Sequence, residues 1–150
     1  MTTIATTQDA EKALDDMSAL IEKITKIMEE EMALVHAGHV KKATALGAAK
    51  SELTSALYTG GERLKANAKF LRQAAPARCT ALQRLQEKFR AVVQRNMLVL
   101  ATAHAVSETI MRRLSGDLAR KSSPQTYGST GRATAPNPRH GKPLAVSRVL

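Results

Sequence analysis

Residues 77–120 decide the fold, and their sequence is ARCTALQRLQEKFRAVVQRNMLVLATAHAVSETIMRRLSGDLAR. Apolar residues recur along this stretch at alternating spacings of three and four, the pattern of a helix that packs along one side. The residues of this apolar seam are Leu82, Leu85, Phe89, Val92, Asn96, Val99, Ala103, Val106 and Ile110. We therefore expect one helix over residues 77–120, which would be about 60 Å long at the usual helical rise per residue.

The chain before this stretch predicts a first helix over residues 8–37. Thr6 and Asp9 have the spacing of a capping box, which satisfies free backbone N–H groups where a helix starts. Gly38 is a residue that ends or bends a helix. An apolar face wide enough for two neighbouring helices is formed by Leu14, Met17, Leu20, Ile21, Ile24, Ile27, Met28, Leu34 and Val35.

A second helix is expected over residues 40–74. Its thinner, alanine-rich seam consists of Leu46, Lys50, Leu53, Leu57, Leu64 and Leu71. Gly60 and Gly61 stand in its middle, and each costs about 1 kcal/mol relative to alanine inside a helix. The sequence leaves open whether the helix kinks or breaks there. The pair Ala75-Pro76 marks the next boundary, because a residue before proline avoids helical backbone angles.

The composition agrees with a helical fold. The chain has 150 residues, of which 43% are hydrophobic and only 3% aromatic, whereas a β-sandwich or barrel needs many β-branched and aromatic side chains. Its length suits a single domain. We predict an all-α protein of three long antiparallel helices, a coiled-coil-like bundle or hairpin, with residues 1–121 as its helical domain.

The last part of the chain, residues 122–150, has a different composition. It holds four of the five prolines and no acidic residue. Proline, glycine and serine at this density do not sustain a helix, so the sequence predicts a flexible, disordered basic C-terminal tail.

Charge is distributed unevenly along the chain. The formal net charge is +10, yet residues 1–31 hold 8 acidic and 3 basic residues. A basic surface can bind nucleic-acid phosphates, so a basic helical nucleic-acid-associated protein is one functional class to consider. Aromatic side chains for base stacking are nearly absent, however, and an acidic first helix that lies beside basic ones accounts for the same pattern.

Residues that could carry out catalysis or hold a metal do not form a recognisable site. His36 and His39 are separated by Gly38 and have no third ligand at metal-binding spacing. Cys79 stands near a helix start without a histidine close in sequence, and the acidic run Glu29-Glu30-Glu31 is typical of a solvated helix face. His104 lies beside the apolar seam and is expected to be packed or half-exposed. We therefore expect no enzymatic activity, no cofactor and no metal.

The sequence indicates a cytoplasmic protein. The longest nearly apolar run, residues 97–106, is far shorter than the roughly 20 residues of a membrane-spanning helix. The N-terminus lacks the basic and apolar regions of a secretory signal. A single cysteine excludes a disulfide within the chain, as fits a reducing compartment.

The stretch from Asn96 to Ser107 is the most informative for function. Asn96 falls on the apolar seam, where a polar residue usually fixes the register between helices. Met97, Leu98 and Leu100 point away from that seam, so the helix is apolar nearly all round at this level. Such a helix is either buried on every side or offers an apolar groove to an amphipathic partner segment. The same apolar face can also pair with itself, which leaves a homo-oligomer open.

Three stretches resemble the FlgN-type flagellar export chaperones. Leu34-Val35-His36-Ala37-Gly38, followed by Lys50-Ser51-Glu52-Leu53, is similar to the place where one family helix ends and the next begins. Gln94-Arg95-Asn96-Met97-Leu98-Val99-Leu100 is similar to the family's asparagine-centred, leucine-rich third helix. Thr126-Tyr127-Gly128-Ser129-Thr130-Gly131-Arg132 resembles the Tyr-Gly element that follows that helix.

The resemblance implies a chaperone without enzymatic activity. Family members bind the C-terminal segments of hook–filament junction proteins and deliver them to the type III export gate. Carried onto this chain, the client-binding residues would be Asn96, Met97, Leu98, Leu100 and Val106, and Tyr127 would contact the cytoplasmic domain of the export gate. A nucleic-acid-associated protein and a purely structural coiled-coil subunit are the alternatives.

Overall fold

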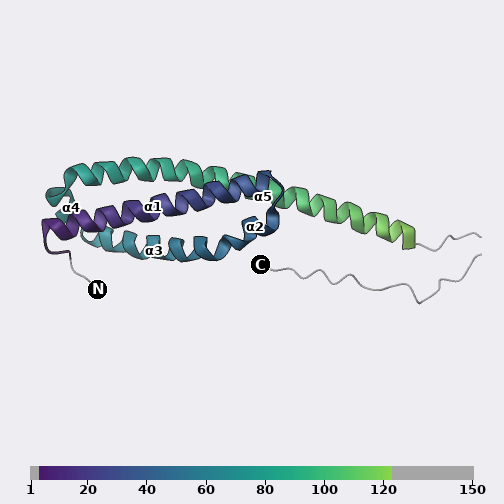
Figure 1. Cartoon of the computed structure of the whole chain (residues 1–150), viewed down its shortest axis with the longest axis horizontal. Helices are drawn as coiled ribbons and strands as arrows, with labels where there is room; N and C mark the ends of the chain where they lie inside the picture. Colours follow the sequence, from purple (N-terminus) through teal and green to yellow (C-terminus); the bar gives the residue numbers. More distant parts are fainter. Residues whose placement is uncertain (1–3, 123–150) are drawn as a thin grey trace, which may run out of the picture. The chain divides into compact units, whose positions relative to one another are not determined.

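The structure is a computed structural model that describes residues 4–122. Within this range every regular element is an α-helix: α1 (Thr7–His36), α2 (Val40–Ala45), α3 (Gly47–Ala66), α4 (Ala68–Ala74) and α5 (Pro76–Ser122) (Figure 1). The prediction of an all-α protein is thus confirmed for the described part of the chain. The predicted basic tail, from residue 123 onward, lies outside the described residues.

The chain divides into two compact units, Met1–His104 and Ala105–Leu150. The described part of the first unit contains α1 to α4 and α5 as far as His104. The described part of the second unit is the continuation of α5 from Ala105 to Ser122.

Helix α1 begins and ends as the sequence predicts. The Thr6 hydroxyl accepts a hydrogen bond from the Asp9 backbone N–H (3.1 Å), and the Asp9 carboxylate accepts one from the Thr6 N–H (3.2 Å), which completes the capping box. At the other end Gly38 has φ 77°, and the His39 N–H donates to the Leu34 carbonyl (2.8 Å). This is a Schellman termination, in which glycine adopts the left-handed conformation at little cost.

The single helix expected over residues 40–74 is instead three helices, α2 to α4. Leu46 keeps helical backbone angles (φ −73°, ψ −13°), but its N–H donates three residues back, to the Ala43 carbonyl. At Asn67 the backbone angles leave the helical region (φ −107°, ψ 14°). The Asn67 backbone N–H donates to Leu64, three residues back, while its side-chain amide donates to the Arg63 carbonyl (2.9 Å). The asparagine side chain therefore replaces the backbone bond that a continuing helix would make.

The sequence left open whether the helix breaks at Gly60-Gly61, and the structure has no break there, because α3 passes through both glycines without interruption. Gly60 lies against α1, and a Cβ atom there would come within 2.9 Å of the Met17 Cε atom. Gly61 has open space around its Cα atom. Gly60 thus lets α3 approach the buried Met17 closely, and packing against α1 offsets the low helix propensity of the two glycines.

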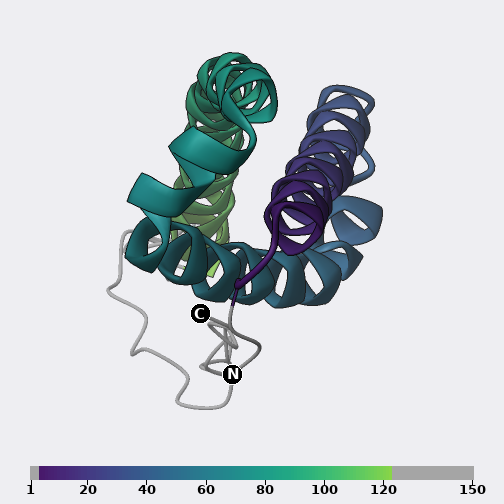
Figure 2. The same ribbon diagram turned by 90° about the vertical axis from the view of Figure 1, so that its left-hand side faces the viewer.

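One face of α1 organises the core of the first unit. Figure 1 shows α3 running back along α1, and Figure 2 shows α3 and α4 crossing from the side of α1 towards the start of α5. The larger cluster of buried residues comprises Ile4, Ala10, Ala13, Leu14, Met17, Ile21, Leu71, Ala75 and Leu82. A second cluster comprises Ile24, Met28 and Val92. The apolar face predicted for the first helix is therefore the face that packs.

Helix α5 begins at Pro76, at the boundary that the sequence predicts. Arg78, two residues into it, forms ion pairs with Glu11 (3.7 Å) and Asp15 of α1. These pairs join the acidic first helix to the basic last one, as the charge pattern predicts. None of the helices in the described range is long and apolar enough to cross a membrane.

Candidate functional site

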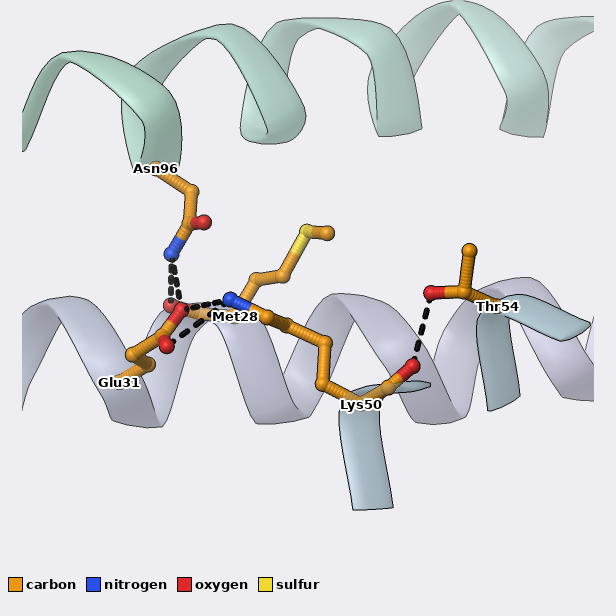
Figure 3. A network of polar contacts seen from close by, with 5 residues as sticks. All are labelled: Met28, Glu31, Lys50, Thr54 and Asn96. Carbon is orange, nitrogen blue, oxygen red and sulfur yellow. Dashed lines mark hydrogen bonds and ion pairs between the residues drawn. The ribbon is translucent and has the colours of Figure 1, made fainter. Parts of the chain in front are cut away.

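A buried polar network ties α1, α3 and α5 together in the first unit (Figure 3). The Glu31 carboxylate accepts hydrogen bonds from the Lys50 ammonium (2.7 and 2.9 Å) and from the Asn96 side-chain amide (2.8 Å). The same amide nitrogen lies 3.3 Å from the Met28 carbonyl, to which it also donates. Glu31 is 5% exposed and Asn96 is 3% exposed.

The burial of Glu31 corrects the interpretation of the acidic run as a solvated helix face. Glu29 and Glu30 are exposed, but Glu31 points inward. A buried carboxylate is tolerated where cations and hydrogen-bond donors surround it, and Lys50 and Asn96 supply both. The signal was present in the sequence, because Lys50 and Asn96 are polar residues on otherwise apolar seams.

The network is suited to fixing register rather than to chemistry. Both oxygens of Glu31 are occupied by donors, and no buried side-chain polar atom in the described range lacks a hydrogen-bond partner. The residues of the described range include no group of three or more His, Cys, Asp or Glu side chains placed to hold a metal. His36 is turned onto its own helix, with its Nδ1 atom 2.8 Å from the Met32 carbonyl oxygen.

The structure does not bring the five expected client-binding residues onto one surface. Asn96 is buried, and its amide is used within the protein. Met97 and Leu98 are 65% and 69% exposed, and Leu100 is half-buried. Val106 is also exposed, but it belongs to the second unit. Tyr127, the expected contact with the export gate, lies outside the described residues.

The exposed positions of Met97 and Leu98 follow from helix geometry. Successive residues of an α-helix are rotated by about 100°, so the two residues after a seam position project away from the packed face. Asn96 occupies the seam, and Met97 and Leu98 therefore face solvent. The expectation that these two residues point away from the seam is confirmed.

The second unit presents an apolar stripe on α5. Four of its members are spaced by four residues and the fifth, Met111, precedes Leu114 by three. Each is between 51% and 54% exposed: Val106, Ile110, Met111, Leu114 and Leu118. We refer to these five residues as the α5 stripe. Val106 and Ile110 are the end of the predicted seam, whereas the last three were missed. The seam's alternation of three and four residues, continued beyond Ile110, falls on the charged residues Arg113, Asp117 and Arg120 instead.

The first unit also has an open hollow of about 250 Å³ near the start of α5. Its apolar wall includes Leu14, Met17, Leu64, Leu71 and Leu82. Cys79 lies in this wall and is partly buried. No acidic residue or histidine lines the hollow, and its charged lining residues are Lys65 and Arg72.

Comparison with protein-family models, with curated proteins and with solved structures finds no match for this chain.

Proposed function

We propose that this protein binds an amphipathic helical segment of another protein through the α5 stripe and catalyses no reaction. The observation that supports the proposal is the exposure of five large apolar side chains within one short stretch of helix. A contiguous exposed apolar face on a helix is typical of a surface that a partner covers. Covering a side chain that is now half exposed contributes about 1 kcal/mol.

An amphipathic helix fits this surface better than a small molecule does. The stripe is a convex line of side chains, so a partner must lie along it and interdigitate rather than enter a pocket. Met111 adds a flexible, polarisable side chain that adapts to irregular partners. A partner that is unfolded alone would become ordered on binding, which keeps the affinity moderate and the complex reversible.

For the partner we propose the C-terminal segment of a hook–filament junction protein. The support is the resemblance of Leu34–Gly38, Lys50–Leu53, Gln94–Leu100 and Thr126–Arg132 to the FlgN-type export chaperones. In this proposal the protein is a cytoplasmic chaperone, and its three antiparallel helical segments are α1, the α2–α4 segment and α5. Met97 and Leu98 in the first unit, and Val106 in the second, remain candidate client contacts. Tyr127 remains the candidate contact with the export gate.

Co-elution from a size-exclusion column with light scattering tests this function. The full chain is mixed with the C-terminal segment of a hook–filament junction protein from the same organism, at low and at high salt. We expect a complex at both salt concentrations, because apolar burial is only weakly screened, whereas phosphate binding falls steeply with salt. No complex at either salt concentration would contradict the proposal. Salt-sensitive binding of DNA or RNA in its place would favour the nucleic-acid alternative.

A further inference from the structure

The two edges of the α5 stripe differ in charge. On one edge Arg112 donates to Glu108 (3.3 Å), so its charge is compensated within the helix. The other edge carries Arg113, Asp117 and Arg120, all exposed, and so has one more positive than negative charge. Among the residues that the structure describes, neither arginine side chain has a hydrogen-bond or ion-pair partner. Arg113 follows Val106 by seven residues and Ile110 by three, which places it directly beside the stripe.

The start of the same helix shows what such an arginine can bind. Arg113 and Arg120 follow Arg78 at whole multiples of seven residues, so all three occupy the same heptad position of α5. In the first unit Arg78 pairs with Glu11 and Asp15, which border the apolar face of α1. Four residues later Leu82 is buried in the same cluster as Leu14 of α1. There, an arginine at this heptad position accompanies an apolar helix with carboxylates along its edge.

We propose that the α5 stripe accepts an amphipathic helix whose apolar face is bordered by carboxylates opposite Arg113 and Arg120. This inference rests on the proposed function and specifies its partner. Each arginine would form a charge-assisted contact at the rim of the interface, where electrostatic complementarity selects between partners of similar apolar surface. A partner with lysines in these positions would meet like charges and bind more weakly.

The chain's own segments fit this surface less well. Residues 121–150 contain 5 basic residues and no acidic one, so the apolar Leu144-Ala145-Val146 in that range is bordered by bases. A second copy, parallel or antiparallel, would present the same edge, in which Arg113 and Arg120 outnumber the one carboxylate, Asp117. Charge therefore favours a different, acidic-edged helix as the occupant.

Two synthetic peptides of opposite edge charge provide the test. Each is about 20 residues long, because shorter helices are marginal in water, with leucines on one face and either glutamates or lysines along one edge of that face. Binding to the full chain is measured by isothermal titration at low ionic strength. We expect the glutamate peptide to bind about tenfold more tightly than the lysine peptide, since two rim charge pairs change from attractive to repulsive.

Charge reversal of Arg113 and Arg120 tests whether these two residues set the preference between the two peptides. The double variant Arg113→Glu with Arg120→Glu should reverse the preference and bind the lysine peptide more tightly. Arg84→Glu with Arg90→Glu is the matched control, because both residues are exposed on the α5 part of the first unit and the change in net charge is the same. The control should keep the wild-type preference for glutamate.

The outcomes separate this inference from the function on which it rests. One outcome would overturn the inference and leave the function standing. In that outcome both peptides bind equally well, Leu114→Asp with Leu118→Asp abolishes the binding, and charge reversal at Arg113 and Arg120 does not change it. Failure of both peptides to bind, or binding that survives the leucine substitutions, would overturn the function as well. Light scattering of the free chain shows whether it forms a dimer. A dimer that Leu114→Asp abolishes would mean that a second copy covers the α5 stripe, and would also overturn the inference.

Discussion

The side-chain amide of Asn96 donates a 2.8 Å hydrogen bond to the buried carboxylate of Glu31, which lies 65 residues earlier in the chain. Because Lys50 binds the same carboxylate, one acidic side chain fixes the register of three helices. Apolar seams tolerate slippage by a turn, but a buried carboxylate in any other register would lose its donors.

Asn96→Ala should destabilise the protein by about 1–3 kcal/mol, because Glu31 and the Met28 carbonyl each lose a buried donor. The free energy of unfolding in urea measures the effect. Gln94→Ala, at an exposed position on the same helix, is the control and should change stability by no more than about 0.5 kcal/mol. Equal effects of the two substitutions would show that the network does not hold the helices in register.

Glu31 and Lys50 should be coupled in a double-mutant cycle. Lys50→Met alone leaves a buried carboxylate without its cation, and Glu31→Gln alone leaves the ammonium partly buried without its anion. The double variant should therefore cost less than the sum of the single ones, by about 1 kcal/mol after allowance for the partial exposure of Lys50. Additive effects would mean that the ion pair contributes no coupling.

Gly61→Ala should stabilise the protein by about 0.5–1 kcal/mol, because alanine favours the helix and meets no atom there. Gly60→Ala gains the same helix propensity but must displace the Met17 methyl group, so its gain should be smaller. Thermal unfolding of the two single variants compares them under one protocol. If the two alanines stabilise equally, the close packing of α3 on Met17 is not a constraint.

The capping box gives α1 a pH-dependent contribution to stability. The hydrogen bond from the Thr6 hydroxyl, together with that from its backbone N–H, lowers the pKa of Asp9 below its usual value. A depressed carboxyl pKa stabilises the fold above the unfolded-state pKa of about 4 and is lost as pH falls through the folded-state value. The stability difference between wild type and Thr6→Ala should therefore be largest near neutral pH and shrink in acid. A difference that stays constant from neutral pH to strong acid would exclude this contribution.

Met97 and Leu98 can be tested as client contacts without disturbing the core, since both are largely exposed. Met97→Asp with Leu98→Asp should weaken binding of the junction-protein segment, while helical circular dichroism stays at the wild-type level. Gln94→Asp is a suitable control because it adds a carboxylate to an exposed position one turn earlier. Unchanged affinity in the double variant would remove this pair of residues from the client surface.

Much of the fold could be predicted because its signals are local. The Thr6–Asp9 cap, the Gly38 termination and the Pro76 start depend on residues within one helical turn, and the structure has all three where the sequence predicts them. The interruptions at Leu46 and Asn67 carry weaker signals, because neither residue forbids a helix. The sequence could not decide whether the helix continues through Gly60, because the role of this glycine depends on its contact with Met17 of another helix, which helix propensity does not include.

The polar network and the α5 stripe depend on contacts between helices, which the sequence pattern alone does not predict. Asn96 and Lys50 were visible as polar residues on apolar seams, but Glu31 could be recognised as their partner only once α1, α3 and α5 were placed together. The stripe was visible as periodicity as far as Ile110. That Leu114 and Leu118 are left exposed depends on what packs against α5, which the sequence pattern alone does not specify.

The most direct test of the central claim is the affinity of the junction-protein segment for two variants of the α5 stripe region. Leu114→Asp with Leu118→Asp places two carboxylates on the stripe, and Ala105→Asp with Ala119→Asp places two on the opposite side of the same helix. Both pairs change net charge equally and concern exposed positions. The account predicts that the stripe variant loses binding at high salt while the control binds as wild type does. Equal affinity of the two variants would contradict it.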